Sequence, residues 1–485
     1  MAGRMLLALD VGTSSVRALT GRFDGKKLRI EESGRFYHGP VYTPASVEWD
    51  MLGIYQRLEE MIRAAVARYG AFSGMAVDSW GTDAVVLDRT GALATNGLST
   101  RDQRFKGLKE EFFRRVPESE IYERTGIQFL DWNTLYLAYA LMRDRPWLAE
   151  AMDRLLFAPD CFAYLLTGEK VCDRTIASTS QMLNARTRSW DARLLAATGL
   201  PAERMLEPQG IACLGAARVS GIPVYMGCGH DTAAAVAGIP LREEKEFYII
   251  AGSWAMMGVE RDLPVISDTA RTLGFSNEGS IDGRVRFLKN SMGMWLIQES
   301  RREWARQGKE LSFVDIAAAS ACSKPYRSII DVNDPRLQAA GDVPGMIGRI
   351  CLESGQPVPE TVGEVARCIS DSLAFKFRLL KEQIELCIAR PCAVIHVAAG
   401  GSQDATLCQT IADVTGCCVY AGPAEASAFG NCATQLIAQG EFSDLSQARE
   451  MLRASLPETV YEPQSNERLE QIYLDAKTRI GLTVA

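Results

Sequence analysis

The sequence has few of the residues that mark metal centres and disulfide scaffolds. It contains only three histidines, and its thirteen cysteines are odd in number and include no Cys-x-x-Cys pair. These absences disfavour a structural zinc site and a disulfide framework. We therefore expect most cysteines to be small buried residues in a reducing compartment, and a Cys351–Cys368 bond remains an open alternative.

Long apolar runs and an excess of positive charge are also missing. No stretch approaches the ~20 apolar residues that a membrane helix needs, and the run Met5–Leu9 is too short for the core of a signal peptide. The formal net charge of -7 argues against a nucleic-acid surface. We expect a cytoplasmic protein with small-molecule ligands and neither a nucleic-acid nor a membrane partner. Its oligomeric state stays open between monomer and homodimer.

The length of the chain predicts two domains. It has 485 residues, of which 47% are hydrophobic, and this exceeds what one hydrophobic core usually serves. The charged run Leu241–Glu246 is typical of a solvated boundary. We therefore predict an N-terminal domain over residues 1–242 and a C-terminal domain over residues 243–485.

An internal duplication supports this division. The apolar strand Leu6–Leu9 runs into a turn of glycine and hydroxyl residues, and a second strand follows at Val16–Thr20. The same pattern returns in Phe247–Ser253 and the strand Ala255–Glu260. Because expected strands alternate with helical patterns in both halves, the sequence predicts α/β layers in each.

The first of these turns has the groups needed to bind phosphate. The N–H groups and hydroxyls of Thr13–Ser15, with the charge of Arg17, can face phosphate oxygens. Asp10 ends the strand, where α/β folds place their ligands. A carboxylate there would hold Mg²⁺ through water, because this ion dehydrates reluctantly. A turn-forming role for Asp10 is the simpler alternative, and Ser253 would contact phosphate from the second turn.

Asp231 is the candidate catalytic base. It follows a strand and a glycine-rich turn, Pro223–His230, and begins a helix of small residues. A helix N-terminus keeps a carboxylate ionised, and a weak base suffices because phosphoryl transfer depends mainly on positioning and charge stabilisation. The alternative is that Asp231 only caps the helix.

A third glycine-rich turn lies in the C-terminal half. The buried strand Ala393–Ala398 ends in Gly400 and Gly401, where a planar base or a ribose can lie against backbone. His396 has apolar neighbours on both sides and is interpreted as a core residue. This turn predicts the nucleotide site.

Three motifs carry a resemblance to a known family. They are Asp78–Asp83, Gly126–Leu130 with Asn133–Tyr136, and Leu288–Gln298. With them the chain resembles the FGGY carbohydrate kinases over about residues 5–465, and the second motif separates it from xylulose and glycerol kinases. The resemblance implies two actin-like (ribonuclease H-like) α/β domains with a central catalytic cleft. It also implies phosphorylation of a ketose, with ATP as co-substrate and Mg²⁺.

The resemblance and the turns together give a set of expected roles. Asp231 is the expected proton acceptor and Asp10 the expected metal residue. The expected substrate contacts are Gly81, Asp83, His230, Asp231, Thr232 and Asn290. The expected nucleotide contacts are Thr13, Ser14, Ser15, Val16, Arg17, Ser253, Gln298, Gly401 and Asp404.

Two departures from the family pattern and several alternatives remain. Ser253 stands where the family usually has Thr, which keeps the hydroxyl. Asp404 stands where an Asn is common, and a carboxylate cannot donate to a base as an amide does. Asp404 therefore either loosens base preference or only caps the following helix. The alternative functions are a kinase for another ketose such as L-fuculose or xylulose, a non-catalytic sugar sensor, and an actin- or Hsp70-like ATPase.

Overall fold

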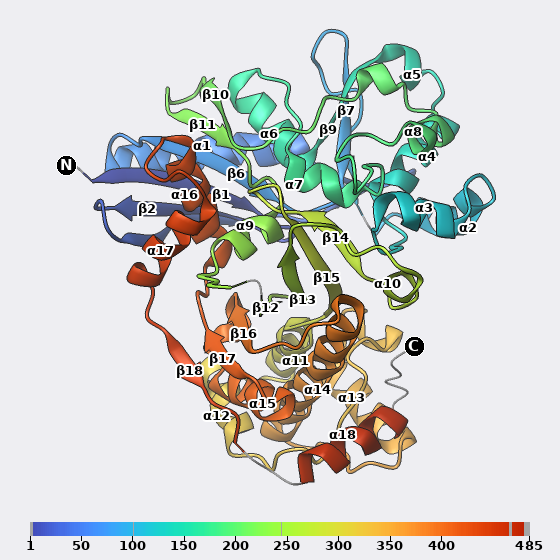
Figure 1. The fold of residues 1–485 in the computed structure, drawn as a ribbon, viewed down its shortest axis with the longest axis vertical. Coiled ribbons are helices and arrows are strands. Elements are labelled where there is room, and N and C mark those ends of the chain that lie inside the picture. Colours follow the sequence, from blue (N-terminus) through green and yellow to red (C-terminus); the bar gives the residue numbers. More distant parts are fainter. Residues whose placement is uncertain (1–2, 100, 244, 465–467, 480–485) are drawn as a thin grey trace. The chain divides into compact units, whose positions relative to one another are not determined.

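The computed structural model describes residues 3–99, 101–243, 245–464 and 468–479 (Figure 1). The chain forms two compact units that interleave along the sequence. The first unit comprises Met1–Pro240, Glu260–Phe287 and Ala426–Leu456, and the second comprises Leu241–Val259, Leu288–Glu425 and Pro457–Ala485. The single boundary after residue 242 stays a prediction.

The first unit is built on a six-stranded sheet with the order β10-β11-β6-β1-β2-β3. The strands β1, β2 and β3 are antiparallel neighbours, whereas β6 pairs parallel with both β1 and β11. The bounds are β1 Arg4–Val11, β2 Ser15–Phe23, β3 Leu28–Tyr37, β6 Gly74–Ser79, β10 Ala212–Ala216 and β11 Pro223–Met226.

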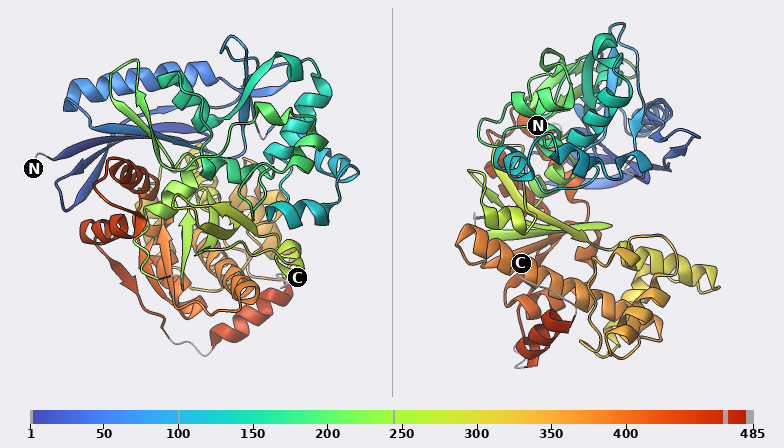
Figure 2. Two further views of the ribbon diagram at one scale, coloured as in Figure 1. Left: turned by 45° about the horizontal axis from the view of Figure 1, so that its top comes forward. Right: turned by 90° about the vertical axis from the view of Figure 1, so that its right-hand side faces the viewer.

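Helices cover both faces of this sheet, as Figure 2 shows for α1 and α16. Side chains alternate between the faces of a strand, so Leu7 and Leu9 of β1 pack with α1 and α6, whereas Leu6 and Ala8 pack with α16 and α17. Burial on both faces explains the continuous apolar run of β1. The helices are α1 Met51–Tyr69, α6 Ala158–Thr167, α16 Ala426–Ala438 and α17 Leu445–Ser455.

A largely helical insertion and several short elements complete the first unit around a second core. Its strands are β4 Val41–Tyr42, β5 Val47–Trp49, β7 Ala84–Asp88, β8 Gly97–Leu98 and β9 Met152–Phe157. Its α-helices are α2 Leu108–Phe113, α3 Glu118–Thr125, α4 Thr134–Asp144, α5 Leu148–Ala151, α7 Arg174–Ala177, α8 Ala192–Thr198, α9 Asp231–Ala237 and α10 Asp268–Thr272. Short 3₁₀ turns are η1 Gln103–Phe105, η2 Ser178–Ser180 and η3 Ala202–Arg204.

The second unit repeats the sheet of the first. The sheet has seven strands in the order β14-β15-β13-β12-β16-β17-β18, where β14 is Ser276–Gly279. In it, β12 is antiparallel to β13 and parallel to β16, which is parallel to β17. The division between the units falls within β13 and β15. The bounds are β12 Glu246–Ala251, β13 Trp254–Arg261, β15 Val285–Met292, β16 Val394–Ala398, β17 Cys418–Ala421 and β18 Thr459–Tyr461. The helical elements are α11 Trp295–Arg306, α12 Phe313–Ala321, η4 Pro335–Leu337, α13 Val343–Glu353, α14 Val362–Ile388, η5 Gly400–Gln403, α15 Ala405–Thr415 and α18 Arg468–Arg479.

The predicted α/β class and its two sheet domains are confirmed. In each unit, a central strand pairs antiparallel with the next strand in the chain and parallel with a later one. All thirteen cysteines, Cys351 and Cys368 included, are free thiols in this structure. Within the parts of the chain that are described, no helix combines the length and the apolar character needed to cross a membrane.

Candidate active site

Asp231 is the first residue of the short helix α9. The preceding turn is tied to the end of β6, because the N–H of Ser79 donates to the carbonyl of Gly229 at 2.8 Å. His230 occupies the N-cap position. The carboxylate therefore lies beside the carboxyl end of a parallel strand and near a helix N-terminus, as the sequence predicts.

The surroundings of Asp231 shift the pKa of its carboxyl. Burial and, to a smaller extent, the nearby carboxylate of Asp10 together raise its pKa to about 7, against the opposing effect of hydrogen bonds from Thr232. Its side chain remains 36% exposed and so is accessible to a ligand. A group with a pKa near the operating pH suits general base catalysis.

Asp10 lies at the end of β1 and is nearly buried. It accepts hydrogen bonds from the guanidinium of Arg17 and from the Ser427 hydroxyl, the latter at 3.1 Å. Arg17 therefore pairs with the predicted metal residue. The adjacent hydroxyls of Thr13 and Ser14 are exposed, as a phosphate-binding turn requires.

The rest of that turn is held by the backbone. The N–H of Gly12 donates to the carbonyl of Ser15 at 3.0 Å, and the His38 ring contacts the Gly12 carbonyl oxygen through Nε2 at 2.7 Å. The Val16 side chain is fully buried. A contact between Val16 and a nucleotide would therefore involve its backbone alone.

Asp78 is a buried carboxyl to which the sequence reasoning gave no role. It lies opposite Asp10 in the parallel pairing of β6 with β1. Burial and the charge of Asp10 raise its pKa well above the usual range, and the Asn431 amide donates to Oδ2 of Asp78 at 2.6 Å. The register was the available signal, since Asp10 and Asp78 end two strands that any parallel sheet would place side by side.

Asp83 holds two indole rings. Its Oδ2 accepts from Nε1 of Trp80 at 2.7 Å and from Nε1 of Trp49 at 2.5 Å, whereas Oδ1 has no hydrogen-bond partner among the described residues. Burial raises the pKa of Asp83 to about 7, against the effect of both indoles. Asp83 is thus a structural anchor here, and its contact with substrate stays a prediction. Trp49 was not anticipated.

The His230 ring is held on both nitrogen atoms. Nδ1 lies 3.2 Å from Nη2 of Arg286 and 3.5 Å from Oε2 of Glu278, and Nε2 lies 3.2 Å from Oγ1 of Thr232. A Cβ atom at Gly81 would lie 3.3 Å from Nε2 of His230. Glycine at this position therefore leaves the space beside Nε2 open, which suits the predicted substrate contacts.

The second unit has a turn of different chemistry. The Ser253 hydroxyl donates to Oε1 of Gln298 at 2.8 Å, so two predicted nucleotide residues are in contact. The N–H of Met294 donates to the Gly252 carbonyl at 2.8 Å and fixes the start of α11 against the turn. Asn290 is half-buried on β15, in the second unit, whereas the other predicted substrate residues belong to the first.

The glycine-rich loop of the second unit leads into α15. Gly401 is buried, and a Cβ atom there would lie 2.5 Å from that of Ala251, so the loop can approach β12 only with glycine. Asp404 is the N-cap residue of α15 and accepts from the N–H of Leu407 at 3.1 Å. The capping interpretation of Asp404 is confirmed, and its contact with nucleotide stays a prediction.

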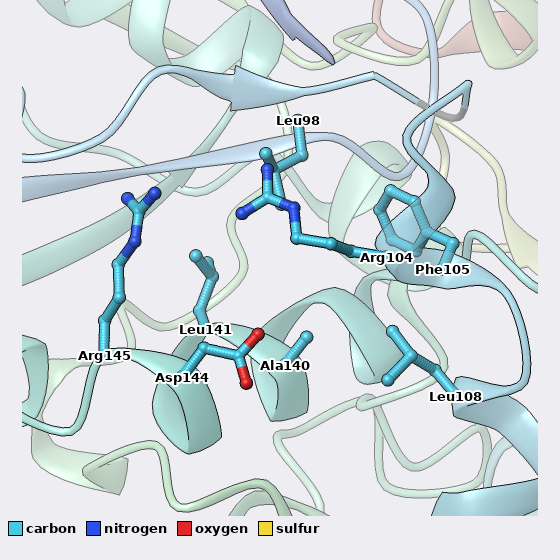
Figure 3. A pocket seen from close by; sticks show the side chains of 8 residues that line it. All are labelled: Leu98, Arg104, Phe105, Leu108, Ala140, Leu141, Asp144 and Arg145. Atoms are coloured by element: carbon cyan, nitrogen blue, oxygen red, sulfur yellow. The ribbon is translucent and has the colours of Figure 1, made fainter. Parts of the chain in front are cut away.

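Two pockets differ greatly in size. One, in the first unit, has a volume of about 10 Å³, room for about one water molecule; Figure 3 shows the side chains that line it, among them Arg104, Asp144 and Arg145. It is too small for a sugar. A second pocket of about 830 Å³ lies in the second unit. Its lining consists of Ala321, Pro325, Tyr326, Arg367, Ala405, Thr406, Gln409, Thr410, Asp413, Tyr461, Gln464 and Arg468.

Comparison with known protein families identifies the family to which the chain belongs. The N-terminal domain of the FGGY family of carbohydrate kinases matches residues 5–238, and the C-terminal domain of the same family matches residues 247–439. The chain therefore belongs to the FGGY family of carbohydrate kinases. It is an enzyme, a sugar kinase with ATP as co-substrate, and the alternative of an actin- or Hsp70-like ATPase is wrong.

Individual proteins are similar to the chain over nearly its whole length. The chain is 35% identical to a rhamnulokinase of Bacteroides thetaiotaomicron, over 97% of this chain and 98% of the relative. It is 36% identical to a rhamnulokinase of Oceanobacillus iheyensis, over 93% and 96% of the two chains.

Solved structures share the fold. Xylulose kinase from Rhodospirillum rubrum superposes with a TM-score of 0.78 at 19% identity, covering 98% of each chain. Plasmodium falciparum glycerol kinase with ADP has the same TM-score at 14% identity, covering 98% of this chain and 97% of that one. At these identities the likeness concerns the fold alone.

Proposed function

We propose that this enzyme phosphorylates L-rhamnulose to L-rhamnulose 1-phosphate with ATP, a step in rhamnose breakdown. The nearly full-length similarity to rhamnulokinases supports this substrate. The observation that carries the proposal is the position of Asp231, a carboxyl with a pKa of about 7 at the start of α9, beside His230 and Thr232. A cytoplasmic location is part of the proposal and is supported by the free thiols.

The sugar side of the reaction is assigned to the first unit. Asp231 accepts the proton of the attacking hydroxyl, and His230 and Thr232 line the place of the ketose beside it. Gly81 keeps the space beside the His230 ring open. Asn290 is proposed to complete the sugar contacts. The base needs only moderate strength, because positioning and charge stabilisation dominate phosphoryl transfer.

The nucleotide side uses both turns. The segment Thr13–Arg17 and the Ser253–Gln298 pair would contact phosphate oxygens through hydroxyl, amide and guanidinium donors. Gly401 and Asp404 would lie at the nucleoside, and we place the base in the 830 Å³ pocket, whose lining includes Ala405 and Thr406, the two residues that follow Asp404 in the chain. That volume is in the ordinary range for a small-molecule site.

The carboxyl groups of Asp10 and Asp78 end neighbouring strands in register, and oxygen ligands of this kind suit Mg²⁺. The part of the chain that is described contains no group of three or more His, Cys, Asp or Glu side chains arranged for a metal. Mg²⁺ in kinases is commonly held by one or two carboxylates, with water and substrate phosphates as the other ligands. Asp10 would supply the carboxylate, and the bound ion would neutralise charge on the phosphates.

A ketose panel tests the substrate. The enzyme is incubated with Mg-ATP and L-rhamnulose, L-fuculose or xylulose, and ADP release is measured for each. We expect the highest kcat/KM with L-rhamnulose. A higher kcat/KM with another ketose would make that sugar the substrate instead of L-rhamnulose. No ADP release with any sugar would favour the sugar-sensor alternative.

A further inference from the structure

Arg286 is a fully buried arginine to which the proposed mechanism gives no role. Its Nε donates to the Gly279 carbonyl at 3.0 Å, and its Nη2 faces both Oε2 of Glu278 at 3.1 Å and Nδ1 of His230 at 3.2 Å. Nη1 has no hydrogen-bond partner among the described residues. Burying a guanidinium is expensive unless its contacts are specific, so the His230 contact calls for a function.

The contact with Arg286 determines the tautomer of His230. A guanidinium can only donate hydrogen bonds and keeps its charge in proteins. Nδ1 of His230 must therefore accept, and the proton of the neutral ring lies on Nε2. The charged groups against the ring are Arg286, Glu278 and Asp231. Burial and the charge of Arg286 hold the pKa of His230 well below its usual range, which keeps the ring neutral.

With this tautomer, each hydrogen bond around α9 is donated toward Asp231. Nε2–H of His230 donates to Oγ1 of Thr232 at 3.2 Å. The Thr232 hydroxyl then has its own proton available for Oδ1 of Asp231, at 3.0 Å. Oδ2 of Asp231 is left for the proton of a ligand. The chain of donors thus runs from Arg286 through His230 and Thr232 to one oxygen of the base.

We propose that Arg286 is a positioning residue that holds His230 in the neutral Nε2–H tautomer and so directs a hydrogen-bond chain onto the catalytic base Asp231. The inference rests on the proposed role of Asp231. Glu278 completes the arrangement, because it pairs with the same guanidinium nitrogen and keeps the arginine in place. Arg286 touches neither substrate nor reacting atoms in this scheme.

Histidine NMR tests the first link of the chain. The protein has only three histidines, so ¹⁵N-labelled histidine gives few ring signals, and His230→Gln assigns those of residue 230. We expect the wild-type ring in the Nε2–H form, without titration around the value of about 6.5 at which a free histidine titrates. In Arg286→Met the tautomers should mix and the ring should titrate.

Two further variants serve as controls for this measurement. Arg286→Met leaves Glu278 unpaired and could unfold the unit, so the double variant Arg286→Met/Glu278→Gln repeats the test without a buried unpaired charge. Arg284→Met is the matched control, since Arg284 pairs with Glu260 and Asp282 and does not contact His230. The control should keep the wild-type tautomer. An Nδ1–H ring in the wild type, or an unchanged ring in both Arg286 variants, would overturn the inference.

Kinetics test the link to the base. Arg286→Met should lower kcat about 10–100-fold, the loss expected when a hydrogen bond to a charged group is weakened or removed, with a smaller change in the KM of the ketose. Thr232→Val should have a similar effect, and Thr232→Ser, which retains the hydroxyl, should recover most of the activity. If both residues act through one chain, the double variant Arg286→Met/Thr232→Val is scarcely slower than the worse single variant.

Multiplicative losses in that double variant would contradict the chain. The NMR result does not require turnover, so it decides the tautomer even if the wild-type enzyme phosphorylates no ketose. Such a lack of turnover would remove the proposed function, whereas a wrong tautomer in an active enzyme would remove only the role of Arg286.

Discussion

The hairpins β1–β2 and β12–β13 share a scaffold and differ in their chemistry. Each leads from a buried central strand through a short turn with exposed hydroxyls, and each central strand has a parallel neighbour. The first hairpin carries Asp10 with Arg17, and its parallel neighbour ends near Asp78. In the second hairpin, the Ser253 hydroxyl donates a hydrogen bond to the side-chain oxygen of Gln298. The repeated backbone supplies two turns with exposed hydroxyls, and the side chains around each turn differ in charge.

This difference explains why acid–base chemistry is assigned to the first unit. The carboxylate of Asp10 raises the pKa values of both Asp78 and Asp231, and the charge of Asp231 also raises that of Asp78. The neutral pair Ser253–Gln298 can donate hydrogen bonds but cannot take a proton at neutral pH. The second turn is therefore expected to bind, and the first to bind and react.

The largest expected effect comes from removing the base. Asp231→Asn should lower kcat by about 10²–10⁴-fold, the usual span for a lost acid–base group. Binding of the ketose should change little, because the amide nearly matches the carboxylate in shape. Steady-state rates and calorimetric sugar binding on the folded variant check this. Turnover near the wild-type value would refute the assignment of Asp231.

A matched pair of substitutions tests the contrast between the two turns. Asp10→Asn should lower kcat by about 10–100-fold and raise the Mg²⁺ concentration needed for half-maximal rate. Ser253→Ala removes one neutral hydrogen bond of about 1 kcal/mol, so it should raise the KM for ATP about fivefold with little change in kcat. Mg²⁺ and ATP titrations of both variants distinguish these outcomes. Equal effects of the two substitutions on kcat would contradict the proposed difference between the two turns.

The smallest expected effect concerns Asp404. Because Asn caps a helix about as well as Asp, Asp404→Asn should leave the stability of the protein unchanged. We expect the wild-type enzyme to use GTP or ITP within about tenfold of ATP, a gap of roughly 1.4 kcal/mol. The Asn variant should shift preference toward ATP at an unchanged KM for the sugar. Values of kcat/KM for the three nucleotides check this, and an unchanged strong preference for ATP would leave Asp404 with capping alone.

Local sequence patterns were sufficient to predict part of the fold and part of the candidate site. The duplicated hairpins, the helix beginning at Asp231 and the cap at Asp404 follow from apolar runs, glycines and capping residues within a few positions. His396 is also confirmed as a core residue, where its Nε2 lies 2.9 Å from Glu246.

Contacts between distant segments could not be predicted in this way. Trp49 reaches Asp83 across 34 positions, and Arg286 reaches His230 across 56. No local periodicity encodes such pairs, because they depend on how separate elements pack. The Asp78–Asp83 motif could be recognised locally, whereas Asn431, the hydrogen-bond donor to Asp78, lies 353 positions away.

The pH dependence of kcat/KM for the ketose tests the assignment of the base most directly. Burial and the carboxylate of Asp10 raise the pKa of Asp231, hydrogen bonds from Thr232 and the charge of Arg286 lower it, and the net value is about 7. The base acts when deprotonated, so we expect kcat/KM to rise with pH through about 7 and then level. The residual activity of Asp231→Asn should lack this rise. A wild-type profile that is flat through pH 7, or a rise that persists in Asp231→Asn, would contradict the account.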